Sequence, residues 1–128
     1  HTVLKFSPQG KLLLTLGTPG TAGAPPKAFT EPNDVAIAAD GSIFVAEAHN
    51  DQFMDQNAPQ GVGRISKFKA DGTFIKSFGK YGYGPGEFRG AHALAFDSKG
   101  RLFVADRGNR RIQIFDQEGK HLDTWYQF

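Results

Sequence analysis

The chain contains no cysteine, and this absence excludes two classes of small protein. Without thiols it cannot be a disulfide-stapled scaffold, and it cannot bind a metal through thiolate ligands. A surplus of one charge is also missing, because 15 basic and 13 acidic residues leave a formal net charge of +2. Such a small surplus argues against nucleic acid as the main partner. No apolar run approaches the roughly 18 residues of a membrane-spanning helix, and no signal peptide is visible.

Phenylalanine and glycine are, by contrast, abundant, with 12 and 16 copies among 128 residues. Aromatic residues favour strands and glycine supplies turns. This composition predicts one ordered, turn-rich domain rather than a disordered segment. No segment shows the apolar periodicity of a helix.

Two segments of the chain repeat one another without gaps. Residues 29–47, FTEPNDVAIAADGSIFVAE, align with residues 88–106, FRGAHALAFDSKGRLFVAD. In a second pair, residues 64–79 and 111–126 share Arg, Ile, Phe and Gly positions, and residues 2–17 are a further copy of this second half. Such internal repetition is the signature of a repeat architecture.

Each copy consists of short strands separated by turn residues such as ADG, DSKG and QEG. The first strand of the unit is expected at 34–38 and 93–96, and the second at 43–46 and 102–105. The third is expected at 3–6, 65–68 and 112–115, and the fourth at 12–16, 73–78 and 121–125. Four antiparallel strands with a period of about 40 to 50 residues predict the blades of an all-β β-propeller. A sandwich or a solenoid is the alternative, because turns at this spacing also suit a sandwich.

The repeats divide the chain into a half blade (1–17), a full blade (29–79) and a second full blade (88–128), about two and a half four-stranded blades in all. The middle copy alone carries an insert, residues 48–63, between its second and third strands. Long loops of this kind are uncommon without a function or disorder.

The last copy resembles an NHL repeat, a β-propeller unit. The resemblance rests on a Gly-Pro-Gly-x-Phe turn, on Gly-x-Leu-x-Val-Ala-Asp, and on Asn-x-Arg-Ile followed by Phe-x-x-x-Gly. These positions are filled by Gly84, Pro85, Gly86, Phe88, Gly100, Leu102, Val104, Ala105, Asp106, Asn109, Arg111, Ile112, Phe115 and Gly119. The resemblance implies an NHL-type propeller of six blades. The remaining blades, or a second copy of the chain, would then cover its open strand edges.

Within that family, the chain is similar to the peptidyl-α-hydroxyglycine α-amidating lyases. The similarity implies that His92, near the start of a first strand, binds zinc, and that Arg107, after a second strand, lines the active site. After the second strand of the previous blade, where those enzymes carry an active-site Tyr, this chain has EAHND, with His49 nearest to that position. Asn33 falls at a first-strand position that holds no ligand in that blade of the family. The other two zinc histidines would lie on blades outside this chain. The similarity also suggests a secreted or extracytoplasmic protein.

Blade topology is expected to bring these residues together. Strand direction alternates through a blade, so the first strand starts, the second ends and the third starts at one edge, here called the rim. His92, Arg107, His49 and the insert all map to the rim. Imidazoles from three blades could hold Zn²⁺ with an open coordination position. The metal would lower the pKa of a substrate hydroxyl, a nearby base would take the proton, and Arg107 could bind a carboxylate.

Each candidate also has a structural interpretation. His92 could hydrogen-bond a neighbouring loop, because a single histidine is weak evidence for a metal. Arg107 could be a solvated or ion-paired residue of a polar turn. The position of His49 is open, because its loop differs in length from the aligned turn. The acidic residues Glu47, Asp51 and Asp55 could form a cation site, but their position favours a solvated loop.

Other residues are expected to support the blades. Asp106 and Asn109 would tie the turn through local side-chain-to-backbone bonds. Arg111 aligns with Arg64 and would be structural, although Arg110 and Arg111 together could touch a phosphate. The recurring aromatic position would pack between blades, as Phe6, Phe68 and Phe115.

The sequence thus predicts a propeller segment whose rim binds a ligand. In one hypothesis the segment belongs to a metal-dependent, lyase-like protein that acts on a small molecule or a peptide. In the other it is a non-catalytic scaffold that binds protein, carbohydrate or nucleic acid. The His92–Arg107 pair favours the first, and the missing Tyr favours the second.

Overall fold

The computed structural model describes residues 1–48 and 61–126, and these residues form antiparallel sheets. The first sheet has two strands, β1 (Thr2–Phe6) and β2 (Leu12–Gly17). The second has β3 (Pro32–Ile37), β4 (Ile43–Glu47), β5 (Arg64–Phe68) and β6 (Phe74–Phe78). The third has β9 (Ala91–Phe96), β10 (Leu102–Asp106), β11 (Arg111–Phe115) and β12 (His121–Trp125).

Three short elements complete the described part of the chain. Strands β7 (Lys80–Tyr81) and β8 (Glu87–Phe88) form a small parallel pair in the loop that leads to β9. A single 3₁₀ turn, η2 (Arg107–Asn109), joins β10 to β11. The sequence did not indicate η2, because a three-residue turn has no periodicity of its own.

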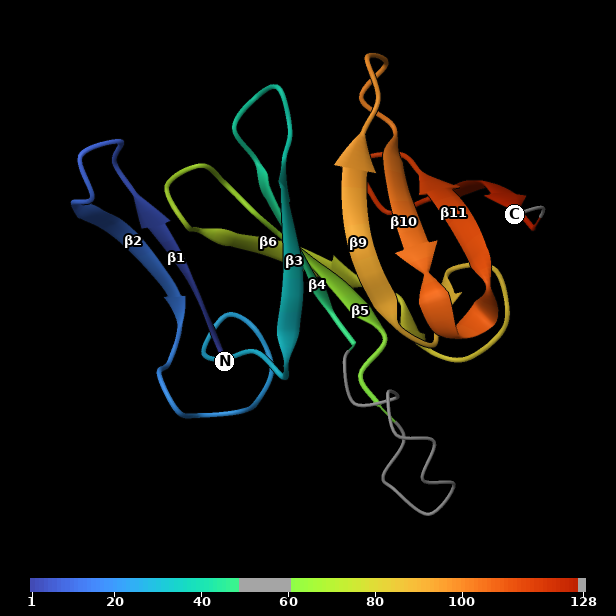
Figure 1. Ribbon diagram of the computed structural model, residues 1–128, viewed down its shortest axis with the longest axis horizontal. Helices are drawn as coiled ribbons and strands as arrows, with labels where there is room; N and C mark the ends of the chain where they lie inside the picture. The colour runs from blue at the N-terminus through green and yellow to red at the C-terminus, as the bar shows by residue number, and fades with distance from the viewer. Residues whose placement is uncertain (49–60, 127–128) are drawn as a thin grey trace.

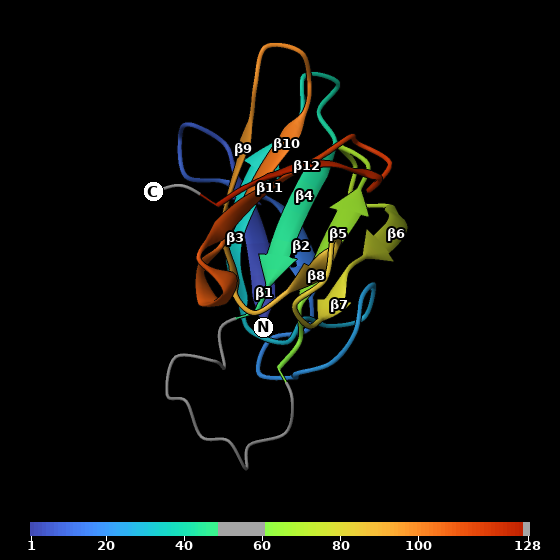
Figure 2. The same cartoon turned by 90° about the vertical axis from the view of Figure 1, so that its right-hand side faces the viewer.

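The three sheets stand face to face like the blades of a fan (Figure 1). Turned by 90°, the sheet of β9–β12 lies in front of the sheet of β3–β6 (Figure 2). Within each four-stranded sheet the strands pair in chain order. The first strands β3 and β9 are also in contact with each other. This order and stacking agree with a partial β-propeller, so the all-β fold class expected from the repeats is confirmed.

Local turn chemistry explains why the strands end where they do. In the turn between β5 and β6, a carboxylate oxygen of Asp71 accepts a hydrogen bond from the Thr73 N–H over 2.9 Å. Gly72 has a φ of 91°, a left-handed conformation that glycine adopts without strain. Asp40 makes the same contact with the N–H of Ser42 between β3 and β4. These turns are therefore specified by their own residues.

The core lies between the sheets rather than inside any one of them. One cluster, between the second and third sheets, includes the buried side chains of Phe44, Ile65, Phe88, Leu102, Val104 and Phe115. The other, between the first and second sheets, includes Leu16, Phe29, Ile43, Val45 and Phe68. Each blade is thus stabilised by apolar surface that its neighbour covers.

The recurring aromatic position follows this rule in two of its three copies. Phe68 and Phe115 are buried against the preceding blade, as expected. Phe6 is 52% exposed, so its expected packing is absent from this structure. The reason is geometric, because β1 belongs to the first sheet and Phe6 alternates away from Val3, which faces the second sheet.

Candidate functional site

The rim comes together where β9 starts and β10 ends, at the lower edge in Figure 1. Ala91 lies opposite Asp106 across the sheet, and the N–H of Arg107 donates a hydrogen bond to the carbonyl of Gly90 over 2.9 Å. His92 on β9 and Arg107 on η2 are therefore at the same edge, and both residues are exposed. The structure brings the backbones of these two candidates together as the repeat topology predicts.

A β-bulge sets the position of His92. Ala91 pairs with Asp106 and Ala93 pairs with Ala105, so His92 is the extra residue between two consecutive pairs. The second sheet has the same bulge at Asn33, between the pairs Pro32–Glu47 and Asp34–Ala46. Bulges re-aim side chains at sheet edges and next to binding sites. The two aligned residues thus keep equivalent positions on neighbouring blades.

The insert leaves and rejoins the sheet on this rim. Strand β4 ends at Glu47 and β5 starts at Arg64, and these two residues pair with each other. A side chain on Gly90 would meet the carbonyl oxygen of Ala48 at 3.8 Å, so the start of the insert lies beside the start of β9. Residue His49 falls within residues 49–60, outside the described residues, as do the acidic candidates Asp51 and Asp55.

Asp106 is the centre of a buried network below the rim. Its Oδ2 accepts hydrogen bonds from Arg111 Nε and Asn109 Nδ2 over 2.8 Å each, and from Gln113 Nε2 over 3.2 Å. Its Oδ1 accepts the N–H of Arg89 over 2.9 Å. The side-chain-to-backbone bond of Asp106 is therefore not local, contrary to the expectation from the sequence, because it joins the turn to the loop before β9. Since Asp106 and Arg111 are both buried, the structural role expected of Arg111 is confirmed.

Arg111 holds the same loop through its other nitrogen atoms. Its Nη1 donates to the carbonyl of Tyr83 over 2.7 Å, and its Nη2 donates to the carbonyls of Gly84 and Glu87 over 2.7 and 2.9 Å. Asn109 Nδ2 adds a bond to the carbonyl of Gly82 over 2.9 Å. A guanidinium group suits this task because its donors are fixed in one plane. The loop from 82 to 88, which leads into β9, is thus fixed by side chains of the next hairpin.

Glu47 occupies the equivalent place in the second sheet and is fully buried. Arg64 Nε and Nη2 donate to its two oxygens over 2.8 and 2.7 Å. The N–H of Thr30 and the hydroxyl of Ser66 donate to the same carboxylate over 2.7 and 3.1 Å. Both interpretations of Glu47, a cation site and a solvated loop, are therefore wrong, because the residue is buried in β4 and Arg64 already neutralises its charge.

A hydrogen bond between blades fixes the two first strands relative to each other. Asp34 Oδ2 accepts the N–H of Leu94 over 2.7 Å. Leu94 is two residues from His92, and Asp34 directly follows Asn33. The bond therefore sets the spacing of the two bulged residues along the rim. The aligned residue of the third sheet is Ala93, which has no carboxylate to repeat the contact.

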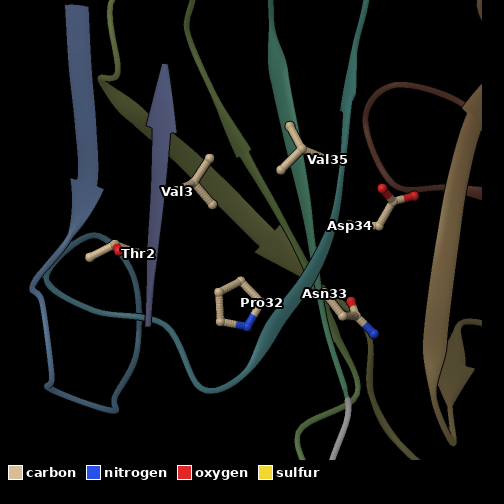
Figure 3. Close-up of a pocket in the computed structure, with 6 residues that line it drawn as sticks. All are labelled: Thr2, Val3, Pro32, Asn33, Asp34 and Val35. Carbon is tan, nitrogen blue, oxygen red and sulfur yellow. The ribbon is translucent and has the colours of Figure 1, made fainter. Parts of the chain in front are cut away.

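A hollow of about 370 Å³ lies between β1 and β3. The residues that line it include Val3, Pro32, Asn33 and Asp34, and Figure 3 shows the side chains of Asn33 and Asp34 on the side of β3 that faces β9. The hollow is where the first and second strands of the first blade would stand in a complete repeat. We therefore place the candidate site at the rim and not in this hollow.

The described residues do not complete a metal site by themselves. Among residues 1–48 and 61–126, no three His, Cys, Asp or Glu side chains are grouped closely enough to hold a metal ion. The same residues contain no helix that is both long and apolar enough to cross a membrane.

Comparison with known proteins decides the family of the repeat. Residues 88–115 match the family model of the NHL repeat. The chain carries an NHL repeat. The match covers the bulge at His92, the Asp106 network and η2. The resemblance to NHL-repeat proteins that the sequence motifs indicated is confirmed.

Relatives of this NHL-repeat chain are longer proteins. NHL repeat-containing protein 3 of Homo sapiens is 36% identical over 129 aligned positions, which cover 98% of this chain and 34% of the relative. Peptidyl-glycine alpha-amidating monooxygenase B of Xenopus laevis is 35% identical over 122 positions, 90% of this chain and 13% of the relative. A probable peptidyl-alpha-hydroxyglycine alpha-amidating lyase of Caenorhabditis elegans is 32% identical over 108 positions, 82% of this chain and 28% of the relative. The chain thus spans about a third, or less, of the length of these relatives.

Proposed function

We propose that the rim of this NHL-repeat segment is a ligand-binding site of a zinc-dependent, lyase-like protein. The observation that supports it is that His92 and Arg107, 15 positions apart in the sequence, lie at the same sheet edge, where β9 starts and β10 ends. The similarity to amidating enzymes over most of the chain supports the same proposal.

The side chain of His92 is of a type that binds zinc. His92 offers an imidazole on a bulge at an exposed edge, and a neutral imidazole is a common zinc ligand. The remaining ligands would come from other blades or from residues outside the described part. Bound zinc would act as a Lewis acid toward a substrate hydroxyl.

The chain's own residues would bind and orient the substrate. Arg107 carries an exposed guanidinium on a short 3₁₀ turn, where it can bind a carboxylate through two parallel hydrogen bonds. The buried Asp106–Arg111 pair holds that turn against the loop before β9. His49, in the insert, would serve as the second catalytic group. A small molecule or a peptide with a free carboxylate is the ligand that this set of groups suits.

The remaining partner of the segment would be further propeller blades or a second copy of the chain. The exposed apolar side of β1, where Phe6 is 52% exposed, is the kind of surface that another blade covers. At the other end, Trp125 is 46% exposed and stacks edge-on against Phe103 with ring centroids 5.4 Å apart.

A non-catalytic scaffold is the second candidate function. It is supported by the similarity to NHL repeat-containing protein 3 along almost the whole chain. It is also favoured by the sequence after the second strand of the middle blade, which lacks the Tyr that the resemblance to the amidating lyases implies there. In this case the same rim would bind protein, carbohydrate or nucleic acid without turnover.

Metal analysis of the complete protein separates the two proposals. We expect bound zinc in the purified protein and its loss in His92→Ala. His121→Gln is the matched control, because His121 starts β12 at the opposite edge and Gln can keep its contact with the Thr124 hydroxyl, 2.7 Å away. If zinc is absent from the parent protein, or remains in His92→Ala, the metalloenzyme proposal fails and the scaffold proposal stands.

A further inference from the structure

Tyr83 is an exposed aromatic residue that a further blade would not cover. It is 66% exposed, the largest fraction among the bulky apolar and aromatic residues that the structure describes. Phe6 and Trp125 lie on strands, where the face of another sheet can pack on them. Tyr83 lies instead between β7 and β8, two strands at the lower edge in Figure 2. Because propeller blades pack through their faces, we expect this loop to stay at the surface of the complete protein.

Hydrogen bonds hold the backbone of Tyr83 on both sides. Its N–H donates to Glu87 Oε2 over 3.0 Å, and its carbonyl accepts from Arg111 Nη1 over 2.7 Å. Three residues further on, the N–H of Gly86 donates to Gln113 Oε1 over 2.9 Å. Arg111 and Gln113 are themselves buried. The exposed ring is thus carried on a backbone that is fixed before a partner arrives, which lowers the entropic cost of binding.

The preceding blade shows that the fold does not need an aromatic ring at this position. The repeat alignment, continued without a gap, places Ala24 at the position of Tyr83. In that blade Arg64 Nη2 donates to the carbonyl of Gly23 over 3.1 Å, much as Arg111 reaches the carbonyl of Tyr83. The backbone contacts of the loop are therefore repeated without the tyrosine side chain. Its role lies outside the packing of the blade.

The surface beside Tyr83 is positively charged. The guanidinium of Arg89 lies over the Tyr83 ring, 5.0 Å from the ring centroid, in a cation–π contact. Arg110 is exposed and directly follows Asn109, whose Nδ2 donates to the carbonyl of Gly82. Within residues 1–48 and 61–126, no carboxylate forms an ion pair with Arg110. A carboxylate from another molecule can therefore pair with it.

Carboxylates close to this surface are already engaged. Asp106 is paired with the buried Arg111, and Glu87 is paired with Lys80 over 3.0 Å. Neither acidic group compensates the charge of Arg110. Charge complementarity thus favours an acidic partner.

The backbone at Arg110 does not account for an arginine there. Its φ of 51° and ψ of 49° lie in the left-handed region, which glycine adopts without strain and a residue with a Cβ does not. An arginine at such a position costs conformational energy. A charged contact with a partner gives the side chain a use that the free protein does not show.

We propose that Tyr83 and Arg110 form a docking site for an acidic segment of a partner protein. An apolar side chain of the segment would pack on the open surface of the Tyr83 ring, and a neighbouring carboxylate would pair with Arg110. Tyr and Arg are the residue types that contribute most to protein interfaces. The loop offers one exposed ring, whereas a single nucleic-acid strand stacks successive bases on several. The inference goes beyond the proposed function, because it requires neither zinc nor Arg107.

The test is the selection of random dodecapeptides, displayed through their carboxyl ends, on the complete protein. The fusion leaves no terminal carboxylate, so these peptides do not mimic the ligand proposed for the rim. We expect enriched peptides to carry Asp or Glu beside an aliphatic, aromatic or Pro residue. When the same peptides are synthesised with amidated ends, Tyr83→Ser should weaken their binding about tenfold, as for an interface hot spot. Tyr83→Phe keeps the ring and should bind as the parent protein does.

Arg110→Gly separates a docking role from a structural one. The substitution removes the charge and relieves the left-handed backbone, so the Tm should stay level or rise while peptide binding weakens. Lys120→Ala is the control for charge. Lys120 is exposed in the turn between β11 and β12, at the opposite edge, and its loss should leave peptide binding unchanged.

Several outcomes would overturn the inference. They are a selection that enriches no peptide, enrichment of neutral or basic peptides, and peptides that Tyr83→Ser binds as tightly as the parent protein does. Binding of oligouridylate that depends on Tyr83, in place of peptide binding, would replace the protein partner by a nucleic acid. Zinc content and its loss in His92→Ala are measured separately, so the metal proposal can stand when the docking site fails.

Discussion

The carboxylate of Asp34 accepts a hydrogen bond from the backbone N–H of Leu94 over 2.7 Å, and this bond joins the first strands of two neighbouring blades. The N–H belongs to the strand that carries His92, and the carboxylate belongs to the strand that carries Asn33. A side chain of one blade therefore fixes the backbone of the next at the candidate site. Coupling of this kind lets one repeat stabilise another.

Removing this carboxylate should loosen the two blades from each other. We expect Asp34→Ala to lower the free energy of unfolding by about 1.5–3 kcal/mol, because a hydrogen bond to a charged acceptor is lost. Asp34→Asn keeps an acceptor oxygen and should lose less. Urea unfolding of the complete protein measures both changes. Equal losses in the two variants would show that the hydrogen bond is not the cause.

The buried Asp106–Arg111 pair should be among the most sensitive positions of the chain. Arg111→Met leaves the Asp106 carboxylate buried without its cation, and breaking a buried pair costs about 3–5 kcal/mol. Arg110→Ala, at the exposed neighbouring residue, should change the unfolding free energy by less than about 0.5 kcal/mol. Denaturant midpoints of the two variants are the measurement. A loss for Arg111→Met no larger than that of the control would contradict the network.

Gly108 should be needed for the close approach of η2 to the loop before β9. A Cβ at this position would collide with the backbone carbonyl oxygen of Arg89, which cannot rotate away. Gly108→Ala should therefore cost about 1–3 kcal/mol and displace Arg107 from the start of β9. Gly84→Ala is the matched control, because its Cβ would meet only the flexible side chain of Glu87, at 3.2 Å. The prediction fails if the two variants unfold at the same denaturant concentration.

The turn carboxylates should make stability fall in acid. The backbone N–H of Arg101, followed by the guanidinium of the same residue and the backbone N–H of Lys99, lowers the pKa of Asp97. A backbone hydrogen bond from Gly84, followed by a contact with Lys80, lowers the pKa of Glu87. The unfolded chain, with ordinary pKa values of about 4, then binds protons before the folded chain does.

The stabilisation from these carboxylates is therefore complete above about pH 5 and is lost as the pH falls through the lower folded-state pKa values. Urea unfolding between pH 3 and pH 6 should show this decline. Asp97→Asn should flatten it, because the substituted residue no longer titrates. If the unfolding free energy declines with pH equally in the parent protein and in Asp97→Asn, the Asp97 carboxylate does not contribute to the decline.

Exposed apolar side chains on the first and third sheets lead us to expect that residues 1–128 associate with one another when produced alone. Because Phe6 and Trp125 are 52% and 46% exposed, the isolated segment should self-associate. Phe6→Glu combined with Trp125→Glu should reduce this association. Light scattering after gel filtration gives the mass. A monomer with well-dispersed amide resonances in the parent segment would refute self-association.

The sequence by itself determined the strands of the blades, their turns and the order of the blades, but not the short parallel pair of β7 and β8. The turns are specified by adjacent residues, as Asp71 and Gly72 show, and the strands by β-branched, aromatic and aliphatic residues between those turns. The alignment of the sequence repeats then showed which positions are equivalent, including His92 with Asn33 and Arg111 with Arg64. These features depend on neighbours in the chain, and a sequence displays them directly.

Only the tertiary structure decided which of these residues have partners. Glu47 and Asp106 both end a strand before a polar segment, and their burial depends on arginines that reach across the sheet. The bulges depend on pairing between strands, and the exposure of Phe6 depends on which blade stands beside it. Burial and hydrogen-bond satisfaction arise from contacts between segments far apart in the chain, so the pattern within one segment does not contain them.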